Sequence, residues 1–252
     1  MQAIISDIHS NIEALEAVLE DIAQQGPQEI LCLGDVVGYG PEPEETIDRI
    51  ENLCRFCLSG NHDYAVLTRA DRFNPLAVEA VRFTRDVLRP GAVSLPRKRA
   101  RWQFLEELPT RKEEDSTLYV HGSPRDDRNE YILESDLLFP QDGKIRDILD
   151  HTTSLLFIGH THVPGVIGED MSFWRPEKSG VAFPLQTNAK YIVNVGSVGQ
   201  PRDGDPRACY VLAYPDRIVY RRVKYDFRKT MKKLAHVGPL SAGAAERLMY
   251  GR

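Results

Sequence analysis

The residues of this chain that are best suited to metal chemistry gather in five short segments. Together the segments hold five of the seven histidines, with aspartates and an asparagine beside them. They are Asp7-Ile8-His9, Gly34-Asp35, Gly60-Asn61-His62-Asp63, His121-Gly122 and Gly159-His160-Thr161-His162. A site for two neighbouring divalent ions needs a bridging carboxylate and, around it, neutral nitrogen and oxygen ligands. The segments supply both kinds of ligand, so the sequence predicts a two-metal hydrolase.

Each segment follows a short apolar run that is typical of a buried strand. The runs are residues 3–5, 29–33, 56–58, 117–120 and 154–158. Five strands are therefore expected to deliver ligands at their C-terminal ends, which is where open α/β sheets place their sites. Residues two apart in an extended backbone face the same way, so we expect Asp7 with His9, and His160 with His162, to aim at one centre.

The five segments resemble the blocks of the calcineurin-like metallophosphoesterase superfamily, which run D-x-H, G-D, G-N-H-[DE], H-G and G-H-x-H in this order. Residues 34–41, 194–202 and 204–208 look like the small bacterial and archaeal phosphoesterase branch, and the resemblance spans about residues 1–225. It implies an α/β fold, a four-layer α/β/β/α sandwich of two mixed β-sheets. It also implies a metal-dependent enzyme that hydrolyses a phosphomonoester or phosphodiester, with a nucleotide as one candidate substrate.

The resemblance also implies a role for each residue of the site. One metal would be held by Asp7, His9, Asp35 and His162, and the other by Asp35, Asn61, His121 and His160. Asp35 would be the bridge, and His62 would be the catalytic proton donor. Ligands without thiolate admit two divalent ions of manganese, iron, zinc, nickel or cobalt, and we favour manganese.

The residue types fit this chemistry. Two cations that share a water lower its pKa toward neutrality, which makes hydroxide available, and both draw charge from the phosphoryl oxygens. The leaving alkoxide then needs a proton, and an imidazole whose ordinary pKa is about 6.5 is well matched to give one. His62 is the candidate for that step.

Two residues near the blocks have open roles. Asp63 could orient His62 or cap the helix that follows. Arg202, after a glycine-rich turn, could grip a substrate phosphate with two hydrogen bonds or be a surface turn arginine.

Two other functions stay in view. Ser/Thr protein phosphatases carry a second aspartate and an arginine soon after the G-D block, and residues 36–40 offer neither. The fold is also used as a non-catalytic interaction module, as in the small retromer subunit, which lacks the histidine of the asparagine block. The presence of His62 favours catalysis. A DNA repair nuclease of this superfamily would be expected to have a longer chain, a capping domain and a more basic surface.

Length and charge agree with one enzyme domain over residues 1–252, with a helical insertion at about 68–110. The first strand begins at once, so we expect no signal peptide, and no apolar run approaches membrane-spanning length, which predicts a cytoplasmic protein. A net charge of −5 argues against general affinity for nucleic acid or anionic membranes. The expected partner is a small phosphorylated substrate, and the oligomeric state stays open.

The segments between the blocks are individual to this chain. Helices are predicted over 75–88 and 97–108, where they could wall the cleft, and residues 125–140 form a second candidate rim. The basic run Arg97-Lys98-Arg99 with Arg101 could contact a polyanion, but a solvated helix start is the better interpretation. Strands are predicted over 191–195, 208–214 and 217–223, the last as an edge or half-exposed strand.

Overall fold

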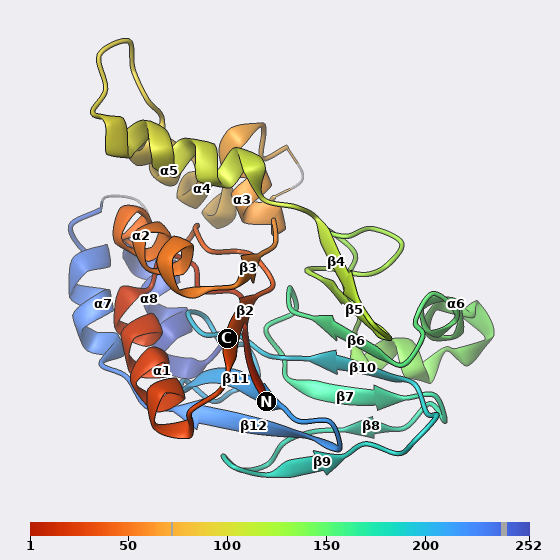
Figure 1. Ribbon diagram of the computed structural model, residues 1–252. Helices are drawn as coiled ribbons and strands as arrows, with labels where there is room; N and C mark the ends of the chain where they lie inside the picture. The colour runs from red at the N-terminus through yellow and green to blue at the C-terminus, as the bar shows by residue number, and fades with distance from the viewer. Residues whose placement is uncertain (72, 238–240) are drawn as a thin grey trace.

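The computed structural model describes residues 1–71, 73–237 and 241–252. Two six-stranded sheets pack face to face, and helices cover their outer faces (Figure 1). Each sheet has parallel and antiparallel neighbours, so the predicted α/β/β/α sandwich of mixed sheets is confirmed. That the whole chain forms one domain stays a prediction.

The first sheet has the order β3-β2-β1-β11-β12-β9. Its strands are β1 (Gln2–Ile5), β2 (Glu29–Cys32), β3 (Phe56–Cys57), β9 (Ala182–Pro184), β11 (Ala208–Ala213) and β12 (Arg217–Val223). β1, β2 and β3 run parallel, and their C-terminal ends therefore reach the same edge of the sheet. Three of the five motif segments follow these three strands.

The second sheet has the order β4-β5-β6-β10-β7-β8. Its strands are β4 (Arg111–Glu114), β5 (Thr117–Val120), β6 (Leu155–Ile158), β7 (Gly165–Gly168), β8 (Phe173–Trp174) and β10 (Tyr191–Asn194). β5 and β6 are parallel neighbours, and the other two motif segments follow them. Each sheet thus brings its parallel strand ends to the site.

Helices α1, α2, α7 and α8 lie on the side of the first sheet, and α6 lies beside the second (Figure 1). Their bounds are Ile12–Gln25, Pro43–Leu53, Phe227–Leu234, Ser241–Tyr250 and Lys144–Asp150, with 3-10 turns at Glu134–Leu138 and Pro140–Asp142. In α1 the residues that are buried against the sheet recur every three or four positions, as a helix with one apolar face requires. Asn11 begins this helix by accepting a hydrogen bond from Ala14 N at 3.2 Å.

A separate group of helices stands at one end of the sandwich, above β3 in Figure 1. It consists of α3 (Asn61–Leu67), α4 (Pro75–Leu88) and α5 (Pro96–Glu107). The last two occupy the positions where the sequence predicts an insertion. Within the described ranges, every helix is too short or too polar to cross a membrane.

The apolar core between the sheets is built from side chains that alternate along the central strands. Ile4, Phe157, Val193 and Val211 are among its fully buried members. Burying one such side chain stabilises the fold by roughly 1.5–3 kcal/mol. Tyr220 crosses this core and donates its hydroxyl toward the backbone oxygens of the second sheet, so its polar end is satisfied.

Some details of the strands and the tail can be compared with expectation. β12 alternates in burial, as predicted for a half-exposed strand, and it is not an edge strand, because β9 pairs with it. The short strands β4, β7, β8 and β9 have no clear apolar pattern and were not predicted. The Gly238-Pro239 break that we expect in the C-terminal tail lies outside the described residues.

Candidate metal centre

The site lies where the C-terminal ends of β1, β2 and β3 meet those of β5 and β6. Its metal-ligating candidates are buried, apart from Asn61, which is partly exposed. Five of them have left-handed backbone with positive φ: Asp7 (54°), His9 (50°), Asp35 (52°), His160 (65°) and His162 (61°). Such residues are strained unless the surrounding structure holds them, and they gather at functional sites. The expectation that an extended backbone aims these side chains is therefore wrong.

Two backbone hydrogen bonds show how the first loop is held. Ile8 N and His9 N both donate to the carbonyl oxygen of Asp35, at 2.9 and 3.0 Å. The loop after β1 is thus fixed to the loop after β2, and its turn brings Asp7 and His9 to the same cluster.

The first cluster consists of Asp7, His9 and His162, whose ligand atoms lie within 4.8 Å of one another. Asp7 Oδ1 is 3.2 Å from His162 Nε2 and 3.8 Å from His9 Nε2. The two ring nitrogens are 3.2 Å apart. These three atoms therefore converge on one point.

The second cluster consists of Asp35, His121 and His160. Asp35 Oδ2 is 3.4 Å from His121 Nε2, and the Asn61 side-chain oxygen is 3.2 Å from that same nitrogen. His160 and His162 thus belong to different clusters, although they are two residues apart. The seven candidates that the sequence singles out do come together.

Asp35 stands between the two clusters. Its Oδ2 is also 3.6 Å from His9 Nε2, which belongs to the first cluster. Its other oxygen accepts a hydrogen bond from His62 N at 2.8 Å, which fixes the carboxylate between the two groups. Gly60 is pressed so closely against this carboxylate that a Cβ there would overlap Asp35 Oδ1.

Each ligand histidine is oriented through its second ring nitrogen. His9, His121 and His162 place Nδ1 at 3.2, 3.1 and 2.5 Å from the carbonyl oxygens of Val37, Leu33 and Gln200. His160 is reversed, with Nε2 3.1 Å from Asn129 O. In a neutral ring, donation to a carbonyl leaves the opposite nitrogen with its lone pair directed into the cluster, as metal-ligating histidines require. Although burial lowers the pKa of His121, the carboxylates of Asp35 and Asp7 raise it to about 9, so a metal bound there would displace a proton.

The side chains fit divalent cations. Asp7 Oδ1 is buried and has no hydrogen-bond partner among the described residues, and an unpaired buried carboxylate oxygen is costly unless an ion neutralises it. Although burial raises the pKa of Asp7, the neighbouring rings of His162 and His121 hold it well below its usual range, so the group is a carboxylate. Burial also lowers the pKa of His160 to about 3, which leaves that ring neutral and able to bind a metal.

His62 forms a third group of possible ligands with His9 and Asp35, whose ligand atoms lie within 4.8 Å of one another, but its ring does not bond to a backbone carbonyl among the described residues. Its ring packs edge-on against His9 and Phe73, each 4.8 Å away between centroids. The ring borders the cavity over the clusters, while the buried Nδ1 has no partner in the described part of the chain and faces Gly38. Burial, together with the charge of Arg202, lowers the pKa of His62 to about 4, and the negative charge of a bound phosphate ester would act in the opposite direction.

Asp63 holds loops together and does not bond to the ring of His62. Its carboxylate accepts hydrogen bonds from the backbone nitrogens of Asp35, Val37 and Gly60, at 2.8, 3.1 and 3.0 Å. The bond from Gly60 caps α3, which is one of the two roles left open by the sequence. The other two bonds tie the loop after β2 to α3.

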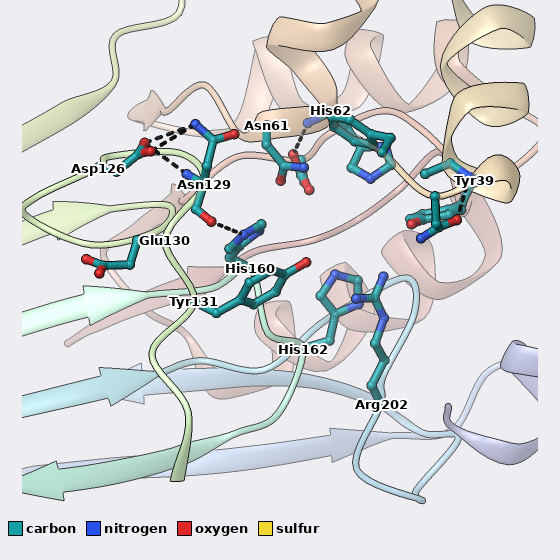
Figure 2. Close-up of a pocket in the computed structure, with 14 residues that line it drawn as sticks. Tyr39, Asn61, His62, Asp126, Asn129, Glu130, Tyr131, His160, His162 and Arg202 are labelled. Atoms are coloured by element: carbon teal, nitrogen blue, oxygen red, sulfur yellow. Dashed lines mark hydrogen bonds between the residues drawn. The ribbon is translucent and has the colours of Figure 1, made fainter. Parts of the chain in front are cut away.

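A cavity of about 390 Å³ opens over the clusters (Figure 2). The insertion contributes Phe73, Asn74 and Ala77 to its wall, and the 125–140 segment contributes Asp126, Asn129, Glu130 and Tyr131. Sequence reasoning located both rims but singled out none of these side chains. Tyr131, which stacks on the ring of His160 with the centroids 4.0 Å apart, carries no motif that could have identified it.

Arg202 points into this cavity beside His162 (Figure 2). Its Nη2 donates to Gln200 Oε1 at 2.7 Å, and its Cζ lies 5.7 Å from the ring centroid of Tyr39. It forms no ion pair with a described residue, so an anion in the cavity could pair with it. The structure thus places Arg202 at the site and not on a remote surface turn.

Comparison with known proteins identifies the class. Residues 3–164 match the model of the calcineurin-like phosphoesterase family. The chain is also 37% identical over 260 residues to MJ0912 of Methanocaldococcus jannaschii, an uncharacterized protein, covering all of this chain and 98% of that protein. The chain belongs to the calcineurin-like phosphoesterase family.

Solved structures agree with this fold. A metallophosphoesterase from Sphaerobacter thermophilus is 36% identical, with a TM-score of 0.82 and coverage of 100% of this chain and 98% of that one. The hypothetical protein PH1004 from Pyrococcus horikoshii is 18% identical with a TM-score of 0.71, covering 100% of this chain and 99% of that one. The second likeness bears on the fold alone.

Proposed function

We propose that this protein hydrolyses a phosphomonoester or phosphodiester with the help of two divalent metal ions. The observation that carries the proposal is the position of Asp35, whose Oδ2 lies 3.6 Å from His9 Nε2 and 3.4 Å from His121 Nε2. One carboxylate oxygen thus faces a ligand of each cluster, which is what a bridging ligand must do.

The assignment of ligands follows from the clusters. Asp7, His9, Asp35 and His162 would hold one ion, and Asp35, Asn61, His121 and His160 would hold the other. Bound divalent ions lower the pKa of water and neutralise charge on phosphoryl oxygens. We favour manganese for an all nitrogen and oxygen ligand set.

The chain's own side chains would bind the ester and move its proton. Arg202 would donate hydrogen bonds to a phosphoryl oxygen, since its guanidinium faces the cavity and no described carboxylate pairs with it. His62 would give a proton from its cavity-facing nitrogen to the departing alkoxide. Phe73 and Tyr39 would keep that ring in place, with Tyr39 4.6 Å from it between centroids.

The two alternative functions are less well supported. A purely non-catalytic interaction module would not account for the placement of His62 at the cavity beside Arg202, which has no ion-pair partner among the residues that the structure describes. A Ser/Thr protein phosphatase would carry an arginine soon after Gly34-Asp35, and here that segment supplies Tyr39 to the cavity wall. We therefore expect diesters or nucleotides to be better substrates than phosphoproteins.

A substrate panel tests the proposal. Protein reconstituted with each candidate metal would be assayed on monoesters, diesters, dinucleoside polyphosphates and phosphopeptides. Hydrolysis of a diester or nucleotide that requires added metal is expected. Faster hydrolysis of a phosphopeptide than of every diester and nucleotide would overturn the substrate preference, and metal-independent or absent hydrolysis would overturn the function. The cytoplasmic location stays a prediction.

A further inference from the structure

A second cavity adjoins the first on the side of α3. It measures about 500 Å³, and it shares Asn61, Phe73 and Asn129 with the cavity over the clusters. Figure 2 shows Asn61 and Asn129 at the upper side of the first cavity. Each cavity alone has the size of a small-molecule site, which is roughly 300–1,000 Å³. A small phosphate ester would fit in the first, so the second has room for the rest of a larger substrate.

The second cavity offers an aromatic surface. Tyr64 lines it and is 46% exposed, although tyrosine rings usually bury much of their area. The Arg128 guanidinium lies 4.4 Å from the centroid of this ring, and its Nε donates to Ser59 Oγ at 3.2 Å. Arg128 is not among the residues that line the cavity, and its guanidinium covers one face of the Tyr64 ring. Phe73 adds a second aromatic ring where the two cavities join.

The same cavity carries polar groups of both signs. Arg69 and Asp71 both line it. Arg69 forms no ion pair within the described ranges, so its donors could reach a phosphate or a sugar hydroxyl. The carboxylate of Asp71 could accept from a ribose hydroxyl or from the amino group of a base.

Building on the proposed function, we propose that this second cavity binds the nucleoside part of a nucleotide substrate. The base would stack on Tyr64, because every base has a π face that an aromatic ring can contact. The ester phosphorus would lie in the first cavity, near Arg202 and the two clusters. The substrate class is therefore a nucleotide ester and not a simple sugar or alkyl phosphate.

Binding of two analogues that cannot be hydrolysed tests the subsite. In the 5′-phosphonates of adenosine and of ribose, carbon replaces the bridging oxygen, so the two differ only in the base. Calorimetry on manganese-loaded protein should show about tenfold tighter binding of the adenosine compound, within the range for stacking one base. Tyr64→Ala should reduce this preference toward one, and Tyr64→Phe should keep it.

Tyr214→Ala is the matched control. Tyr214 also carries an arginine over its ring, with Arg217 Cζ 4.0 Å away, but it follows β11 at the opposite end of the first sheet. Its loss should leave the tenfold preference unchanged. Equal affinity of the wild-type protein for the two phosphonates, binding of neither, or a preference that survives Tyr64→Ala would overturn the subsite.

The outcomes separate this inference from the proposed function. Metal-dependent hydrolysis of diesters together with equal binding of the two phosphonates would remove the subsite and leave the function standing. A clear preference for the adenosine compound with no hydrolysis of any ester would overturn the proposed function and leave the binding subsite standing. A third outcome is that a phosphopeptide binds, that the adenosine phosphonate does not, and that Tyr64→Ala lowers the affinity for the phosphopeptide. In that case the cavity binds a different substrate and the nucleoside assignment is wrong.

Discussion

Two sets of arginines in this protein are placed in opposite surroundings. On α5, Arg97 and Arg101 reach across to α2, where their Nη2 atoms contact Asp48 at 2.5 and 2.7 Å. At the cavity, the Arg202 guanidinium donates to the neutral oxygen of Gln200 and lies near the ring of Tyr39, and it forms no ion pair with a carboxylate in the described part of the chain. Arg97 and Arg101 form ion pairs within the fold, whereas the guanidinium of Arg202 is available to an anionic ligand.

Carboxylates show the same contrast. Asp48 and Glu44 on α2 receive the arginines of α5, while Asp7 Oδ1 in the first cluster is buried without a described hydrogen-bond partner. A charged side chain that is ion-paired within the fold contributes to the free energy of unfolding. Its removal should leave metal binding and ester hydrolysis intact. A charge that the fold leaves unpaired in a buried position can be neutralised by a bound ion. The following experiments test this distinction.

The largest effect is expected for Asp35→Asn, because an amide in this position supplies less charge to both clusters at once. Loss of a residue that hydrogen-bonds to a metal ligand lowers metal affinity roughly 10–100-fold. Loss of the bridging carboxylate itself should lower the affinity for both ions by more than this. Activity should fall by at least about 10⁴-fold, the upper range for losing one general acid. Elemental analysis after dialysis measures the metal, and an ester assay measures the rate.

His9→Gln is the matched comparison for the bridge. His9 lies in the first cluster, so its loss should weaken chiefly one of the two sites and leave about one metal equivalent bound. If Asp35→Asn retains two full equivalents at micromolar protein, Asp35 is not the bridge.

His62→Asn should give the next largest effect. If His62 only donates a proton, the variant keeps both metals and loses roughly 10²- to 10⁴-fold in turnover on an alkyl leaving group. A nitrophenolate departs without a full proton, so the loss on nitrophenyl esters should be clearly smaller. Loss of metal, or equal impairment on both ester types, would show that His62 is a ligand or a positioning residue.

Gly38→Ala should disturb the site without removing any polar group. Gly38 has a φ of 102°, and a Cβ there would lie 2.5 Å from His62 Nδ1. Because displacement of a reacting group by about 1 Å can cost about 10²-fold in rate, turnover should fall by that order while metal content stays. As for His62→Asn, the loss in rate should be larger on alkyl esters than on nitrophenyl esters.

Gly26→Ala provides the control for backbone strain. Gly26 ends α1 with a φ of 66°, and nothing lies within 4 Å of a Cβ built there. This change should cost only the left-handed strain of about 1–2 kcal/mol in unfolding free energy. If both glycine variants lose stability alike and keep full activity, the contact between Gly38 and His62 has no role in catalysis.

The strands before the motifs, and the fact that the candidate ligands come together, could be predicted from sequence because both are encoded locally. Each apolar run that precedes a motif is long enough to indicate a buried strand, and each motif holds its ligands within four residues. β9 could not be predicted, because Ala182–Pro184 has neither length nor alternation. Without β9, nothing in the sequence shows that β12 has a partner on both sides.

The orientation of the ligands depends on contacts between distant segments. His9 takes a left-handed backbone because its amide bonds to Asp35 O, 26 residues away in the chain, and a local pattern does not record that bond. Tyr131 reaches His160 for a similar reason, since the loop that carries it contacts the segment after β6, where Asn129 O lies 3.1 Å from His160 Nε2. Motifs therefore identify ligands, but only the tertiary structure shows the walls of the cavity.

The smallest effect is expected for Arg101→Ala on α5. Arg101 pairs with Glu44 and Asp48, and its side chain is only 16% exposed, but both carboxylates are about one-third exposed and solvated. Exposed ion pairs contribute at most about 1 kcal/mol, so urea unfolding should show a loss of that size or less, and a smaller one in high salt. Arg99→Ala on the same helix is the control, because Arg99 donates to the carbonyl oxygen of Ala92 and forms no ion pair with a described residue. Ester hydrolysis and metal content should be unchanged in both variants.

A larger fall in turnover for Arg101→Ala than for Arg99→Ala would mean that the paired arginines of α5 also position the cavity wall. The division between paired and unpaired charges would then not hold for this protein.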